Sequence, residues 1–228
     1  SSMPSSPPFS ARCATRRPAR FRIAGHLVAL LVALMSVVAG PALAQQSDDF
    51  NACDIDPGLW SVVDPVGDAT VSIVGAGSGD AALQIDIPGG TSHEAWTTNT
   101  AVRALQPVSD VDLSLEAKFD SIPDARYEMQ GIVVQQSDDV FLRFEFHWAG
   151  NGHYAYIAAI NGASASTKTW KPIAGVPRYM RVVRTGSQWT LSWAAADQVF
   201  SDVATFTHQI VATEVGPYAG NYSAGSAP

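Results

Sequence analysis

The stretch that decides the fold is residues 129–160, MQGIVVQQSDDVFLRFEFHWAGNGHYAYIAAI. Apolar and polar side chains alternate along three runs within it, and a period of two is typical of β-strands. Ser137-Asp138-Asp139 separates the first two runs, and Gly150-Asn151-Gly152 separates the last two. Because Asn-Gly is the strongest short-range hairpin signal, we predict three antiparallel strands joined as a meander.

The two connections also predict the register of this meander. A two-residue turn in the second connection pairs His147 with Tyr156, and the first connection pairs Gly131 with Glu145. One face is then apolar and must be the buried one, since a slip by one residue would bury charged side chains instead. The apolar face consists of Ile132, Val134, Leu142, Phe144, Phe146, Trp148, Ile157 and Ala159.

The opposite face is the candidate binding surface. Its central strand carries a guanidinium, a carboxylate and an imidazole in succession, and same-face neighbours on a strand lie about 6.5–7 Å apart. Gly131 and Ala158 flank Glu145 and are expected to leave open space above it. Polar groups among aromatic rings suit a saccharide, although an ordinary solvated sheet face also alternates in this way. The candidate ligand contacts here are Arg143, Glu145, His147, Tyr154, Tyr156 and Gln135.

Working outward, similar short alternating runs fill the rest of the chain beyond Trp60, with no sustained helical stripe. Gly, Pro, Asp or Asn clusters bound each run, and many short strands at such spacing indicate an all-β sandwich or barrel. The other predicted strands are 69–74, 81–87, 111–119, 179–184, 188–194 and 205–212, with a further strand ending at Asn221. The residues after it resemble a loop, so we expect that a closing strand is missing and that the C-terminus is truncated.

Residues 1–44 are predicted to be a cleavable signal peptide. Five arginines precede an apolar run from Leu27 to Val38, and Ala42-Leu43-Ala44 follows as a small-x-small cleavage site, which is the order that signal peptides require. The apolar run is shorter than the ~20 residues of a membrane span. We therefore expect a secreted, periplasmic or cell-surface protein, with no membrane insertion after cleavage and one domain over residues 45–228.

Charge excludes two classes of partner. The whole chain has a formal net charge of −7; five of its 14 Lys and Arg lie in residues 1–44, and all 21 Asp and Glu follow that segment, which leaves −12. Nucleic acids and anionic membranes both require clustered Lys and Arg, so neither is an expected partner. The oligomeric state has no signature in the sequence.

The sequence predicts no cofactor and no metal site of specific spacing. Of two cysteines, only Cys53 lies beyond the predicted signal peptide, and we expect it to be a small buried apolar residue without a disulfide. Asp48-Asp49 and Asp138-Asp139 offer oxygen ligands for calcium, but neither pair has the spacing of a calcium loop.

Several aromatic residues and one histidine lie outside the central meander. Trp189 and Leu191 share a face and are predicted to be core, whereas Trp60, Trp96 and Trp170 lie near expected turns and are rim or platform candidates. His93 follows a Gly-rich turn, and we place His93 and Trp96 at the rim of the binding face. Ordinary strand-start packing explains this pair equally well.

Several motifs resemble concanavalin A-like, laminin-G-like domains of secreted bacterial proteins. They are Asp48-Asp49-Phe50-Asn51, Leu59-Trp60, Pro65-x-Gly67-Asp68, and the segments 91–96, 127–132 and 179–186. The resemblance implies an antiparallel two-sheet jelly-roll sandwich with a concave outer face, of the kind that accompanies carbohydrate-active enzymes such as β-xylosidases as an accessory domain. Asp197-Gln198 departs from the Asp-Gly turn that is usual in such domains.

Three functions follow, in order of preference. The first is non-catalytic binding of a polysaccharide or glycan on the concave face. The second is a glycoside hydrolase or lyase in the same groove, for which Glu145 is one carboxylate and a second is not identifiable, although hydrolases need two. The third is a structural or protein-binding module of a larger surface protein.

Overall fold

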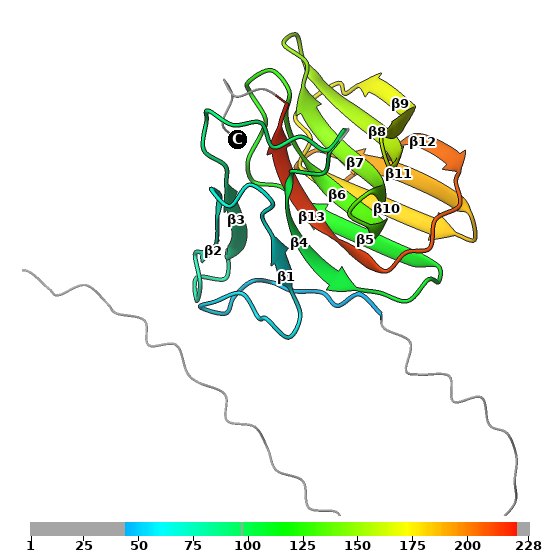
Figure 1. The fold of residues 1–228 in the computed structure, drawn as a ribbon. Helices are drawn as coiled ribbons and strands as arrows, with labels where there is room; N and C mark the ends of the chain where they lie inside the picture. The colour runs from blue at the N-terminus through cyan, green and yellow to red at the C-terminus, as the bar shows by residue number, and fades with distance from the viewer. Residues whose placement is uncertain (1–43, 97, 223–228) are drawn as a thin grey trace, which may run out of the picture.

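The computed structural model describes residues 44–96 and 98–222. Within them the regular elements are strands, arranged as two antiparallel sheets packed face to face and a separate two-stranded ribbon (Figure 1). The predicted all-β, antiparallel jelly-roll sandwich is therefore confirmed. The predicted signal peptide falls outside the described residues, apart from Ala44.

The larger sheet has seven strands and carries the predicted meander at one end. In spatial order the strands are β1 (Ser61–Val63), β4 (Val102–Pro107), β13 (Glu214–Asn221), β6 (Glu128–Ser137), β7 (Val140–Trp148), β8 (His153–Asn161) and β9 (Ser164–Pro172). In Figure 1 the red β13 lies between the green β4 and β6. The last described strand is thus an interior strand and not an unpaired edge.

The smaller sheet has four strands and covers one face of the larger sheet. Its order is β12 (Ser201–Thr207), β11 (Gln188–Ala194), β10 (Tyr179–Thr185) and β5 (Leu113–Lys118). The ribbon consists of β2 (Thr70–Val74) and β3 (Ala82–Asp86), which pair only with each other. In Figure 1 the ribbon lies beside the sandwich, next to β1.

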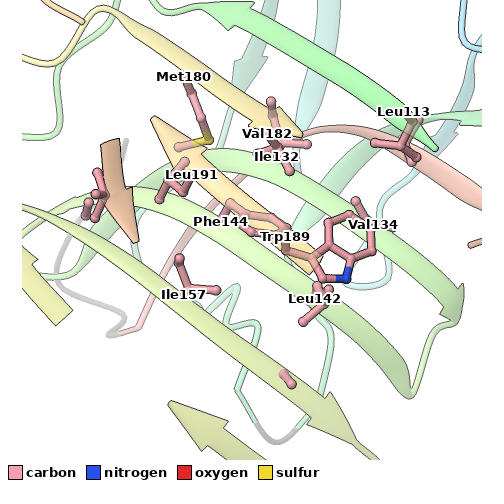
Figure 2. Packing of buried hydrophobic residues seen from close by; sticks show 14 of the residues in the cluster. Leu113, Ile132, Val134, Leu142, Phe144, Ile157, Met180, Val182, Trp189 and Leu191 are labelled. Carbon is pink, nitrogen blue, oxygen red and sulfur yellow. The ribbon is translucent and has the colours of Figure 1, made fainter. Parts of the chain in front are cut away.

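The predicted apolar face is the core. Ile132, Val134, Leu142, Phe144 and Ile157 are at most 3% exposed. They pack against the smaller sheet, whose Trp189 ring lies 6.0 Å from the Phe144 ring. Figure 2 shows Trp189 and Leu191 facing these side chains from β11, as predicted.

One predicted register is confirmed and the other is wrong by two residues. Gly131 pairs with Glu145 as expected, but His147 pairs with Tyr154 and Glu145 pairs with Tyr156. The connection takes four residues, because a type I′ turn needs positive φ at both central positions and Asn151 does not adopt it. Gly150 does, with a φ of 94°. A shift by two residues leaves every side chain on its predicted face.

Strand positions were predicted well where alternation is clean. The ranges of β7 and β11 match the prediction, whereas β12 begins four residues before the predicted 205–212 segment and ends earlier. β1, β4 and β9 were not predicted. In β4, the polar residues Arg103 and Gln106 are as buried as their apolar neighbours. The strand therefore has no exposed polar face of the kind that alternation predicts.

The prediction for Cys53 is wrong. Cys53 is exposed and not buried, and it is disulfide-bonded, whereas the sequence predicts no disulfide. Among the described residues no helix is long and apolar enough to cross a membrane.

Candidate functional site

The outer face of the seven-stranded sheet, opposite the sandwich core, is far more buried than the sequence predicts. Arg143 is 5% exposed, Glu145 2% and Tyr156 5%. The expected open space above Glu145 is absent, because Tyr156 and not Ala158 is its cross-strand neighbour and the Tyr218 hydroxyl reaches it from β13. This face therefore holds a second, smaller core.

The segment around Ala95 and Trp96 covers this second core. Ala95 is 2% exposed and its carbonyl accepts a hydrogen bond of 2.5 Å from Arg143 Nη1. The Trp96 ring lies 6.2 Å from the Tyr156 ring. The buried apolar members of the second core are Ala95, Ala101, Leu105, Met129, Val133, Phe141, Tyr156, Ala158, Ile160 and Tyr218.

Glu145 is the polar centre of the outer face. Its Oε2 accepts hydrogen bonds from Arg143 Nε at 2.8 Å and from the Tyr218 hydroxyl at 2.5 Å, and Arg143 Nη2 lies 2.6 Å away. Burial alone would raise the pKa of Glu145, but the charges of Arg143 and His147 outweigh it and lower the pKa to about 2. Glu145 is thus a carboxylate that is ionised at neutral pH and whose contacts are internal.

The pKa values of Arg143 and Tyr218, which both contact Glu145, are also shifted. Burial alone would lower the pKa of Arg143, but the adjacent Glu145 charge outweighs burial and raises it. Burial and the same carboxylate raise the pKa of Tyr218 well above its usual value. The three groups hold one another in fixed charge states at neutral pH.

His147 lies in a cluster of aromatic rings at one end of the outer face, which we call the His147 cluster. It stacks on Tyr154 with ring centroids 5.9 Å apart and planes at 11°. Tyr156 and Trp170 meet it edge-on at 5.9 and 5.8 Å, and Tyr127 lies 6.4 Å away. The side chain of His147 is only 6% exposed.

Nε2 of His147 has no hydrogen-bond partner among the described residues. Nδ1 lies 3.2 Å from Glu145 Oε1, within ion-pair distance. A buried polar nitrogen without a hydrogen bond is costly. The cluster therefore contains hydrogen-bonding capacity that the protein itself does not use.

Trp170 connects the His147 cluster to solvent. It lies on β9, an edge strand of the larger sheet, and is 54% exposed. Tyr154 beside it is half-buried, and the two rings meet edge-on at 6.0 Å. This end of the outer face thus presents aromatic surface above a buried imidazole.

The structure brings together some predicted site residues and separates others. His147, Tyr154 and Tyr156 are in one cluster, with Trp96 against Tyr156. Gln135 is 2% exposed, donates a hydrogen bond to Glu214, and lies six residues along β6 from Met129, the partner of His147. At about 3.4 Å per residue, that places it about 20 Å from the cluster.

His93 is not at the rim of this face. It is fully buried, and its Nε2 lies 2.7 Å from Asp68 Oδ1. Asp64 joins this pair to form a group whose ligand atoms lie within 4.8 Å of one another. The acid pairs considered for calcium have other roles, since Asp48 binds the Trp60 indole and Asp138 binds Arg103.

The sequence did not predict that three further residues, Tyr218, Tyr127 and Trp170, belong to the outer face. Tyr218 lies on a strand whose range was not predicted, and Tyr127 precedes β6 with a φ of 65°. Trp170 was named as a rim or platform candidate near a turn, but it was not assigned to a strand of this sheet. Thr167 and Thr169, residues of a type that favours strands, were the available signal that Trp170 lies on a strand.

Comparison with known proteins gives a fold and no family. No protein-family model and no curated protein matches the chain. Among solved structures, the GH43 BlXynB protein from Bacillus licheniformis has a TM-score of 0.59 at 16% identity, over 79% of this chain and 36% of that chain. A xylan beta-1,4-xylosidase from Bacillus halodurans C-125 has a TM-score of 0.55 at 17% identity, over 77% and 35%.

A functionally unknown protein from Saccharomyces cerevisiae is also similar, with a TM-score of 0.55 at 12% identity over 73% of this chain and 89% of that chain. The chain spans about a third of the two bacterial proteins but most of the yeast protein. Identities this low show the fold alone. The resemblance to domains that accompany xylosidases is confirmed at that level, and the concanavalin A-like assignment stays a prediction.

Proposed function

We propose that this protein binds a saccharide, without catalysis, at the His147 cluster. The observation that carries the proposal is an exposed tryptophan, Trp170, above a buried histidine whose Nε2 has no hydrogen-bond partner among the described residues. A sugar offers C–H groups that stack on aromatic rings and hydroxyls that satisfy a polar group. Arg143 and Glu145, both named as contacts from the sequence, here serve to position His147.

The charge pattern favours a neutral saccharide over an acidic one. Arg143 is neutralised by Glu145 within the outer face, so neither offers a free charge to a uronate or a sulfate. The chain as a whole has a formal net charge of −7, which repels polyanions at low ionic strength. Neutral xylan-type and glucan-type chains are therefore the expected ligands.

The comparisons and the N-terminal sequence support a role outside the cytoplasm, on polysaccharide. A xylan beta-1,4-xylosidase contains a domain of this fold, and accessory domains can hold an enzyme on its substrate. We extend the proposal to an exported module, because residues 1–44 have the order of a signal peptide.

The contacts of Glu145 argue against hydrolysis in this groove. A glycosidase needs one carboxyl group that is protonated near neutral pH and a second that is ionised. A pKa of about 2 fits Glu145 only for the second role, and its side chain is 2% exposed. Its described contacts are with Arg143, His147 and Tyr218, none of which is a carboxyl group. Saccharide binding is thus the better supported of the two functions.

The test is isothermal titration of the purified chain with neutral xylo- and gluco-oligosaccharides, and with polygalacturonate as the acidic comparison. Trp170→Ala should weaken binding of the neutral ligand by about fivefold or more, because stacking on one aromatic ring contributes about 1 kcal/mol or more. The fold should survive, since Trp170 is 54% exposed. Val199→Ala, a change at a side chain that is 68% exposed, is the control and should leave binding unchanged.

Two results would overturn the proposal. One is an absence of heat with every neutral saccharide while circular dichroism shows a folded chain. The other is an unchanged affinity in Trp170→Ala, which would place the ligand elsewhere on the molecule.

A further inference from the structure

A second group of polar side chains lies away from the His147 cluster, where the ribbon joins the sandwich. Asp64, Asp68 and His93 each offer one ligand atom, and these atoms lie within 4.8 Å of one another. Asp64 and Asp68 come from the turn before β2, and His93 comes from the segment after β3. Saccharide binding makes no use of them.

The turn that carries the two aspartates is fixed by its own hydrogen bonds. Asp64 Oδ1 accepts from the Gly67 amide and Oδ2 from the Ala69 amide, both at 2.9 Å. Gly67 has a φ of 81°, in the left-handed region that favours glycine. Each carboxylate oxygen has two lone pairs, so both oxygens of Asp64 keep one for a ligand.

His93 is built into the fold from the other side. Its side chain is fully buried, and its main chain exchanges hydrogen bonds with Asn221 at the end of β13. Nε2 points at Asp68 Oδ1 at 2.7 Å, and Nδ1 has no partner among the described residues. The side chain of Asp68 is 34% exposed, so the group opens to solvent on one side.

We infer that Asp64, Asp68 and His93 form a binding site for a divalent transition-metal ion of the zinc type. One imidazole and two carboxylates are a donor set suited to zinc and its neighbours, whereas calcium and magnesium prefer oxygen ligands throughout. Ligand atoms around one zinc ion lie about 3–3.5 Å apart, at bond lengths of about 2.0–2.2 Å. The three ligand atoms lie within 4.8 Å of one another, so ion binding would draw them together by about 1–1.5 Å, and the exposed side of Asp68 leaves a position for water.

The metal would connect parts of the chain that the sheets do not join. The ribbon of β2 and β3 pairs with neither larger sheet, while His93 forms a β-bridge with Asn221. An ion held between the turn at Asp64 and His93 therefore fastens the ribbon to the sandwich. Because it binds only the folded arrangement, it stabilises the folded chain.

The experiment uses the full chain, stripped with a chelator and titrated with Zn²⁺, Ca²⁺ and Mg²⁺ by calorimetry. We expect one Zn²⁺ site that neither Ca²⁺ nor Mg²⁺ fills, a Tm that rises with Zn²⁺, and d–d absorption from bound Co²⁺ of the intensity typical of a four- or five-coordinate site. Asp68→Asn keeps a side chain that can bind His93 but removes a charged ligand. It should weaken Zn²⁺ binding at this site by at least about tenfold.

Asp86→Asn is the matched control, because Asp86 lies on the same ribbon, bonded to Gln84, and outside the group. It should leave Zn²⁺ affinity unchanged. Zn²⁺ binding that is equal in Asp68→Asn and the original chain would overturn the inference. So would a failure to bind Zn²⁺, or a site that takes Ca²⁺ as tightly as Zn²⁺.

Discussion

Glu145 is a charged residue at a buried position, of the kind that an apolar side chain usually occupies. It is 2% exposed and surrounded by Arg143, His147 and Tyr218. A buried ion pair is weak support for stability in itself, but removal of one partner leaves an uncompensated buried charge. The sequence reading placed Glu145 on the correct face and gave it the wrong surroundings.

The low pKa of Glu145 predicts an acid-sensitive stability. Its pKa is about 2 in the folded chain and about 4.5 when unperturbed. Between these values the unfolded chain binds more protons, so stability is present above pH 4.5 and is lost as the pH falls towards 2. The contribution is roughly 3 kcal/mol, and chemical denaturation at a series of pH values measures it.

Glu145→Gln separates this group from the other carboxylates. The variant should be less stable at pH 7 by about 3–5 kcal/mol, because Arg143 keeps its charge without a partner. Its stability should also fall less steeply between pH 4.5 and 2. Glu116→Gln, at an exposed pair with Arg181, is the control and should cost at most about 1 kcal/mol. Equal acid slopes for the original chain and Glu145→Gln would contradict the assignment.

At the scale of residues, the sequence predicts on which face of a strand each side chain lies, but not how deeply that face is buried. Alternation in 140–148 assigns each side chain to a face, and every assignment there is confirmed. Burial of the outer face depends on Ala95 and Trp96, which are remote in sequence from Glu145. Local periodicity carries no information about such a cover.

At the scale of elements, close packing of neighbouring strands depends on glycine. A Cβ built on Gly131 would lie 1.9 Å from the Phe144 carbonyl oxygen, and one on Gly216 would lie 1.8 Å from that of Ala104. Both glycines are on strands beside the buried Glu145 and Tyr218 pair. The sequence reading took Gly131 as a source of open space, whereas it permits close approach of the backbone.

We predict that Gly131→Ala destabilises the chain by about 3 kcal/mol or more, because rigid backbone on β7 must move to admit the methyl group. Thermal and urea unfolding measure the change. Gly79→Ala is the comparison, since that turn glycine has a φ of 77° and open space around it. It should cost about 1 kcal/mol from backbone conformation alone. A Gly131→Ala variant no less stable than Gly79→Ala would contradict the packing described here.

At the scale of the whole molecule, one sheet supports two cores. Its inner face packs on the four-stranded sheet, and its outer face packs on the segment around Ala95. The fold class followed from the number and spacing of alternating runs. The strand order did not, because β4 and β13 are adjacent in the sheet and far apart in the chain.

A chain that ends at residue 213 tests the role of β13. It loses the strand between β4 and β6, and with it the Tyr218 hydrogen bond to Glu145. We expect no cooperative unfolding transition and no near-ultraviolet circular dichroism. A chain that ends at residue 222 keeps all thirteen strands and should unfold as the original does. A folded 213-residue chain would show that β4 and β6 can pair without β13.

The interior position of β13 also sets the order of events when the protein is made. Val102 of β4 finds its neighbour Ala219 only after everything between them has been synthesised. Until then β4 and β6 each present bare backbone amides to any strand nearby, which is a template for misassembly. Pairing over such sequence distances makes folding slow. This late closure is compatible with the export that we propose, because a chain whose sheet closes slowly can cross a membrane before it folds.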